Sequence, residues 1–206
     1  MLLVGNLIFG LWFGDLNTPV SECRTIGEEI LDLNQLYPMP TAKIAELEQQ
    51  KKSLLNDLGP VQERSTVHIM LGVLAALMTA LVSSIAITYH IGTSRWCKEV
   101  VQAYSLDEAL VRRSNRLKRN TWPWALITMA AILSIIVLGG ASWPVRPGTN
   151  TAMWVKPHMF TAMIGVYVIA VAFRRQALNI LANHAVIQEI VGEVRRIRLE
   201  RGLEVD

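Results

Sequence analysis

Three long runs without Asp, Glu, Lys or Arg most constrain the fold of this chain. Residues 67–89 supply 23 such residues, residues 122–142 supply 21, and residues 158–173 supply 16. A bilayer core of about 30 Å requires about 20 apolar residues in helical conformation. Because lipid offers no hydrogen-bond partner to the backbone, each run predicts a transmembrane α-helix.

A shorter apolar segment, residues 2–13, precedes them and includes Asn6 and two glycines. No basic residue stands before Arg24, so the segment is not typical of a secretory signal peptide. We interpret it as a short fourth span. A re-entrant segment and a true start upstream of Met1 are the alternatives. The predicted fold class is therefore all-α, a polytopic transmembrane helical bundle over residues 67–173.

The distribution of basic residues predicts the orientation. Lys and Arg number seven in the linker 91–121 and six in the tail 174–206, but two in the loop 143–157. Residues 14–66 hold five Lys and Arg residues and nine acidic residues. Since cytoplasmic loops are enriched in Lys and Arg, we expect the linker and the tail to lie inside. The sequence thus predicts a multi-pass protein of the inner (plasma) membrane.

The extramembrane segments are predicted to be helical. Residues 14–66 should form an external hairpin whose second helix starts at Thr41 and stops at Gly59–Pro60. Two helices are expected in the linker, near 94–104 and 106–119. Residues 174–206 continue as a long C-terminal helix with a seven-residue apolar repeat that suggests a coiled coil, with the linker helix or another subunit as its partner. That repeat consists of Ile180, Ile187 and Val194, together with Asn183, Ile190 and Ile197.

Two histidines carry the sharpest functional hypothesis. On the predicted topology His68 and His158 open two parallel spans at similar depth near the outer face. Two facing imidazoles are the axial ligands of six-coordinate haem b, so both residues are candidate haem-iron ligands. The alternative is that they are interfacial histidines that ligate nothing. Another metal is less favoured, because neither helix places a carboxylate or thiol nearby.

Small residues follow His68 at four-residue steps, and we assign them mainly to helix packing, although they would also leave room for a flat macrocycle. They are Gly72, Ala76, Ala80 and Ser84. A second pair, His90 with His184, is not favoured. It would lie about 33 to 39 Å along the helices from the first pair, too far for efficient electron tunnelling.

No nucleotide-binding, hydrolase or zinc-protease motif occurs in the sequence, and no acidic residue lies within a span. Cys23 and Cys97 are expected on opposite sides of the membrane and are interpreted as structural. A net charge of +3 gives no indication of nucleic-acid binding. The expected partners are the lipid bilayer, and other membrane subunits or a second copy through the outer hairpin and the C-terminal helix.

We therefore expect a non-catalytic integral subunit of a larger membrane complex. In its sharp form it is a b-type cytochrome-like electron-transfer subunit that uses His68 and His158. The alternative function is a cofactor-free membrane scaffold or interaction protein.

Overall fold

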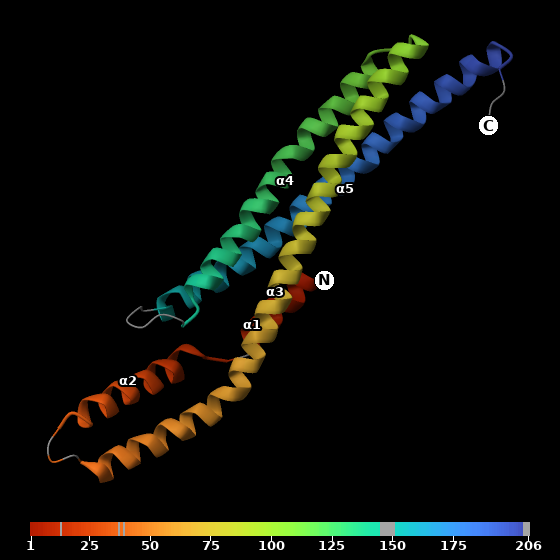
Figure 1. Cartoon of the computed structure of the whole chain (residues 1–206). Helices are drawn as coiled ribbons and strands as arrows, with labels where there is room; N and C mark the ends of the chain where they lie inside the picture. The colour runs from red at the N-terminus through yellow and green to blue at the C-terminus, as the bar shows by residue number, and fades with distance from the viewer. Residues whose placement is uncertain (13, 37, 39, 145–150, 204–206) are drawn as a thin grey trace. The chain divides into compact units, whose positions relative to one another are not determined.

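The computed structural model describes residues 1–12, 14–36, 38, 40–144 and 151–203. Phe13 of the predicted first span and Arg146 of the predicted loop 143–157 lie outside the described residues. These residues form α-helices joined by turns, with one short 3₁₀ helix and no strand among them (Figure 1). The elements in chain order are α1 (Leu2–Trp12), α2 (Asn17–Leu33), α3 (Thr41–Tyr104), α4 (Ala109–Ala141), η1 (Thr151–Trp154) and α5 (Val155–Glu200). The predicted all-α class is confirmed.

Three helices, α3, α4 and α5, are long and apolar enough to cross a membrane, and each contains one of the predicted runs. Their large apolar side chains in these runs are mostly exposed, as lipid contact requires. The segment at the N-terminus forms the short apolar helix α1. The chain therefore has the helices of a membrane-associated protein.

Two predicted helix boundaries are wrong. The second helix of the hairpin does not stop at Gly59–Pro60, because α3 continues through both residues to Tyr104. Pro60 is exposed and removes one backbone donor, a loss that a long helix tolerates. The linker and the second span likewise form one helix, α4, which contains Pro123.

As predicted, a break separates α3 from α4. There Ser105 has φ 53° and Asp107 Oδ1 accepts a 2.7 Å hydrogen bond from the Ala109 amide.

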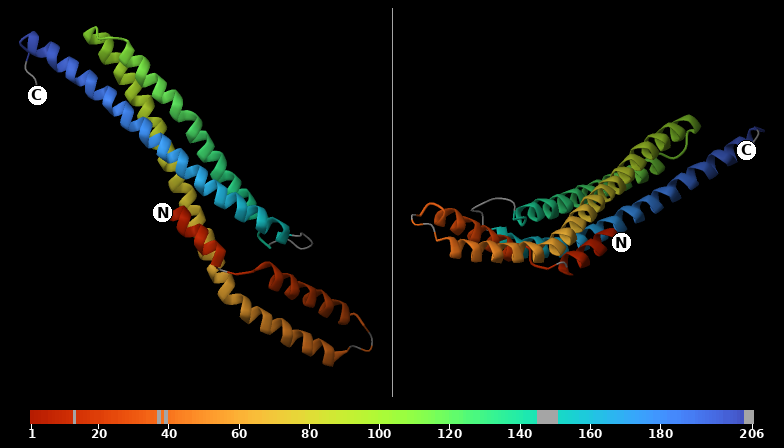
Figure 2. Two further views of the ribbon diagram at one scale, coloured as in Figure 1. Left: turned by 180° about the vertical axis from the view of Figure 1, so that it is seen from behind. Right: turned by 60° about the horizontal axis from the view of Figure 1, so that its bottom comes forward.

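The chain divides into two compact units, which we describe separately. Unit 1 comprises residues 1–75 and 134–164. Within it α2 lies beside the N-terminal part of α3 in both views of Figure 2. Leu16, Cys23 and Leu58 form the buried contact between them. α2 and the N-terminal part of α3 therefore pack on each other as a helical hairpin.

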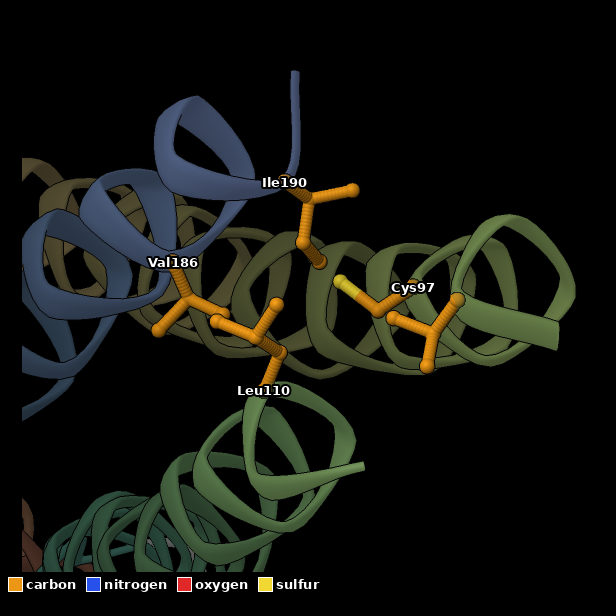
Figure 3. Close-up of a cluster of buried hydrophobic side chains, with 5 residues drawn as sticks. Cys97, Leu110, Val186 and Ile190 are labelled. Atoms are coloured by element: carbon orange, nitrogen blue, oxygen red, sulfur yellow. The ribbon is translucent and has the colours of Figure 1, made fainter. Parts of the chain in front are cut away.

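Unit 2 comprises residues 76–133 and 165–206. Its core brings together Cys97 of α3, Leu110 of α4, and Val186 and Ile190 of α5 (Figure 3). Burying an aliphatic side chain such as Ile190 contributes about 1.5–3 kcal/mol. The apolar repeat of the C-terminal helix therefore packs against α3 and α4 of the same chain. Of the two partners that the sequence suggested, the linker helix and another subunit, the linker helix is the one in contact with it.

A buried polar layer lies next to this core. Asn183 of α5 donates to Thr93 Oγ1 of α3 at 2.9 Å and accepts from Ser114 Oγ of α4 at 2.8 Å. The Ser114 hydroxyl also lies 3.2 Å from that of Ser94. These hydrogen bonds fix the register of the three helices, because each amide or hydroxyl has a partner on a neighbouring helix.

Candidate cofactor site

His68 of α3 and His158 of α5 lie next to each other in unit 1. Their ring centroids lie 6.5 Å apart, and the ring planes cross at 77°. Both side chains are half-buried. The structure thus brings together the two histidines that the sequence analysis paired, although they are 90 residues apart in the chain.

The separation of the rings matches that of two axial ligands on one metal ion. Two imidazole–metal bonds of about 2 Å each, plus about 1 Å from each nitrogen to its ring centre, give roughly 6 Å between centroids. The observed 6.5 Å is close to this value. The described residues contain no group of three or more His, Cys, Asp and Glu that could hold a metal ion. The pair therefore suits a cofactor that brings its own equatorial ligands better than a bare ion.

One nitrogen of the His158 ring is buried without a hydrogen-bond partner. Among the described residues no group donates a hydrogen bond to its Nδ1 atom or accepts one from it. A neutral imidazole nitrogen of this kind is a common metal ligand.

A glycine lies against each ring. A Cβ atom built on Gly10 of α1 would be 2.6 Å from Cε1 of His68, and one on Gly139 of α4 would be 3.0 Å from Cε1 of His158. Ordinary contacts are longer than 3.4 Å, so any larger residue at either position would displace an imidazole. Four helices therefore contribute to the site.

The sequence analysis did not identify Gly10 or Gly139 as residues of this site. The sequence does contain a signal for them. Gly10 lies near the end of the apolar segment 2–13 and Gly139 near the end of the run 122–142, and both ends are expected at the membrane depth of the two histidines. However, no sequence pattern states which helix neighbours which. The contribution of α1 in particular was not anticipated.

A cation lies one helical turn from His68. Arg64 precedes His68 by four residues on α3, and its Cζ atom lies 5.0 Å from the ring centroid of Trp12 on α1. Residues four apart share one face of a helix. A cation–π contact with Trp12 thus holds the Arg64 guanidinium one turn from His68.

The predicted packing stripe on α3 is only partly correct. Gly72 faces the side chain of Asn6, and Ala76 and Ala80 are half-buried. Ser84 is exposed and donates to the Ala80 carbonyl of its own helix. Strict four-residue steps rotate by about 40° each around an α-helix, so the later positions leave the contact face. The buried positions of this run are Ala75, Thr79, Ser83 and Ala86.

The other two histidines do not form a second pair like the first. His184 is exposed, and its Nε2 lies 3.3 Å from Gln188 Nε2 on its own helix. His90 is fully buried in unit 2, with its ring centroid 5.3 Å from that of Tyr89.

Comparison with known proteins adds no family to this description. No protein-family model, no curated protein and no solved structure matches the chain.

Proposed function

We propose that the protein is a b-type cytochrome-like electron-transfer subunit that binds one haem between His68 and His158. The observation that carries the proposal is the pair of imidazoles, whose ring centroids lie 6.5 Å apart and which each pack against a glycine of a neighbouring helix.

Two axial imidazoles favour electron transfer over other haem chemistry. Haem b bound in this way would supply a one-electron couple. His68 and His158 would hold it, and the helices around them would orient the two rings and limit the access of water. Arg64 is the cation on the His68 face of α3 that can pair with a haem propionate.

The membrane setting supports a role within a larger complex. Three helices can cross a bilayer, and the basic linker and tail favour an inner (plasma) membrane orientation with both on the cytoplasmic side. His68 and His158 would then lie near the outer face. A single haem relays electrons only between a donor and an acceptor, so we propose that further subunits supply at least one of them.

Absorption spectroscopy of the full-length protein tests this proposal. Protein produced with an adequate haem supply and purified in detergent should show a Soret band, and reduction should sharpen its visible bands. His68→Ala and His158→Ala should each lose the band, because one remaining imidazole leaves the iron without its second ligand. His184→Ala is the matched control and should keep it, since that side chain is exposed.

The result that would reject the proposal is a colourless wild-type protein that remains helical and monodisperse. That outcome would leave the cofactor-free scaffold as the function. One feature of unit 1 favours that second candidate. Leu31 of α2 and Leu36 after it are 64% and 55% exposed, and apolar side chains on an extramembrane helix are suited to a protein partner.

A further inference from the structure

Five cations of unit 2 form ion pairs with no acidic residue in the described part of the chain. They are Arg116, Lys118 and Arg119 of α4, and Arg174 and Arg175 of α5. None of the ion pairs between described residues includes any of them. We call these five residues the basic band.

The acidic residues of unit 2 that the structure describes are already paired. They lie within residues 99–108 and 189–200, and a carboxylate oxygen of each is within 4.0 Å of an arginine. The pairs are Glu99 with Arg95, Asp107 and Glu108 with Arg112, Glu189 with Arg113, and Glu193 and Glu200 with Arg196. The described part of unit 2 therefore offers the basic band no free carboxylate.

Two contacts between α4 and α5 place the basic band at one end of the apolar runs. Asn179 donates to Thr121 Oγ1 at 3.1 Å, and the Cζ atom of Arg175 lies 5.8 Å from the ring centroid of Trp124. The apolar run of α4 begins at Trp122, so the arginines of α5 lie level with the start of that run. Trp122 is 41% exposed, and tryptophan at the end of a span favours the headgroup layer of a bilayer.

We propose that the basic band binds the headgroups of anionic phospholipids, with the contact between Arg175 and Trp124 at its hydrocarbon edge. An arginine side chain can extend along apolar surface while its guanidinium stays at the headgroups, where it offers paired N–H groups to phosphate oxygens. The contact with Trp124 restrains this guanidinium. On the orientation proposed above, the band lies in the cytoplasmic leaflet, which carries the anionic lipids.

A lipid fits the basic band better than an acidic protein does. The band adjoins the apolar runs of α4 and α5, two helices that can cross a membrane, and an exposed tryptophan lies beside it. An anion bound there is therefore in contact with apolar side chains as well as cations, and a phospholipid supplies both kinds of group. The inference requires insertion into a membrane and does not depend on haem.

Thermal unfolding of the full-length protein in a neutral detergent tests the proposal. Added phosphatidylglycerol should raise the unfolding temperature, whereas phosphatidylcholine with the same acyl chains and inorganic phosphate should not. Each cation near an anionic lipid surface changes the affinity about fivefold. The double variant Arg174→Gln/Arg175→Gln should therefore need roughly 25-fold more phosphatidylglycerol for the half-maximal effect. Arg195→Gln/Arg201→Gln is the matched control and should resemble wild type, because it removes the same charge from exposed positions about 30–40 Å further along the chain's last helix.

The outcomes distinguish lipid binding from its alternatives. Equal stabilisation by the two lipids would overturn the preference for anionic headgroups, and equal stabilisation by inorganic phosphate would overturn the lipid as the bound anion. An equal loss in both double variants would show that net charge alone matters and would overturn the assignment to the basic band. Arg174→Lys/Arg175→Lys keeps both charges and should keep the preference for phosphatidylglycerol, which separates lost binding from misfolding. A colourless protein that shows this preference would reject the haem function alone.

Discussion

The side-chain oxygen of Asn183 on α5 lies 2.8 Å from the hydroxyl group of Ser114 on α4, and both residues are completely buried. Because Asn183 also donates to Thr93 on α3, this one amide connects the three helices of unit 2. Buried polar groups that have all their partners specify a unique packing, whereas groups that lose a partner destabilise the fold.

Replacing this amide by a side chain of similar size should therefore destabilise unit 2. Asn183→Leu removes both hydrogen bonds and leaves the Thr93 and Ser114 hydroxyls with fewer partners. The expected cost is about 1–3 kcal/mol, measured as a loss of unfolding free energy in detergent. Asn115→Leu, at an exposed position of α4, should change the unfolding free energy little. Equal stabilities for the two variants would contradict the proposed role of Asn183.

Asp15 should make the start of α2 sensitive to acid. Its Oδ1 accepts the amide of Asn17 at 2.9 Å and that of Thr18 at 3.4 Å. The hydrogen bond to the Thr18 side chain, helped by these two amides and opposed by burial, lowers the pKa of Asp15 below its ordinary value of 3.8. Because the folded pKa is below the unfolded one, this stabilisation is present above the unfolded value and is lost as pH falls through the folded one.

Hydrogen exchange of the first turn of α2 measures this effect. At pH 7 Asp15→Ala should weaken protection by about 1 kcal/mol, the usual contribution of a helix cap. As pH falls below 3.8 the difference between variant and wild type should shrink. Glu28→Ala, exposed within α2, serves as the control. A difference that persists undiminished in acid would contradict the assignment.

Pro60 and Pro157 form a matched pair for testing the continuity of the long helices. Pro60 lies inside α3 and provides no N–H for the carbonyl of Asn56, whereas Pro157 lies in the first turn of α5. Pro60→Ala should stabilise the protein by about 1–3 kcal/mol, and Pro157→Ala should have little effect, because first-turn amides have no helical acceptor. Thermal unfolding in detergent gives the comparison. Destabilisation by Pro60→Ala would show that the helix requires proline there.

The sidedness of the two ends can be tested with a membrane-impermeant maleimide. Ser21→Cys in α2 should react from the outside of intact cells, and Leu203→Cys only after permeabilisation. The native thiols should interfere little, since Cys23 and Cys97 are both buried. Burial also raises the pKa of the Cys97 thiol, which lowers its reactive thiolate fraction. Labelling of both engineered cysteines from the same side would refute the predicted topology.

The sequence predicted the features that depend on local composition. The three helices that could cross a membrane follow from apolar runs of sufficient length. The proximity of His68 and His158 was predicted by counting residues from the ends of two runs expected to be parallel. Features that depend on the rotation of one helix against another were not predicted. The packing stripe on α3 is one case, because Ser84 rotates away from the contact face.

Two further differences have physical causes outside local sequence. Proline was taken as a stop at Gly59–Pro60, but the flanking hydrogen bonds of a 64-residue helix outweigh the loss of one bond. The role of Gly10 depends on α1 lying against α3, and nothing in residues 2–13 alone indicates that neighbour.

The contact between Gly10 and His68 has a consequence for the interpretation of other membrane sequences. A glycine within a short apolar helix is usually regarded as a weak point of that helix, yet here the missing side chain makes room for an imidazole from a neighbouring helix. The position of such a glycine thereby marks where the neighbouring helix presents its ring. A designer who wishes to aim a histidine across a bundle can omit one methyl group on the opposing helix.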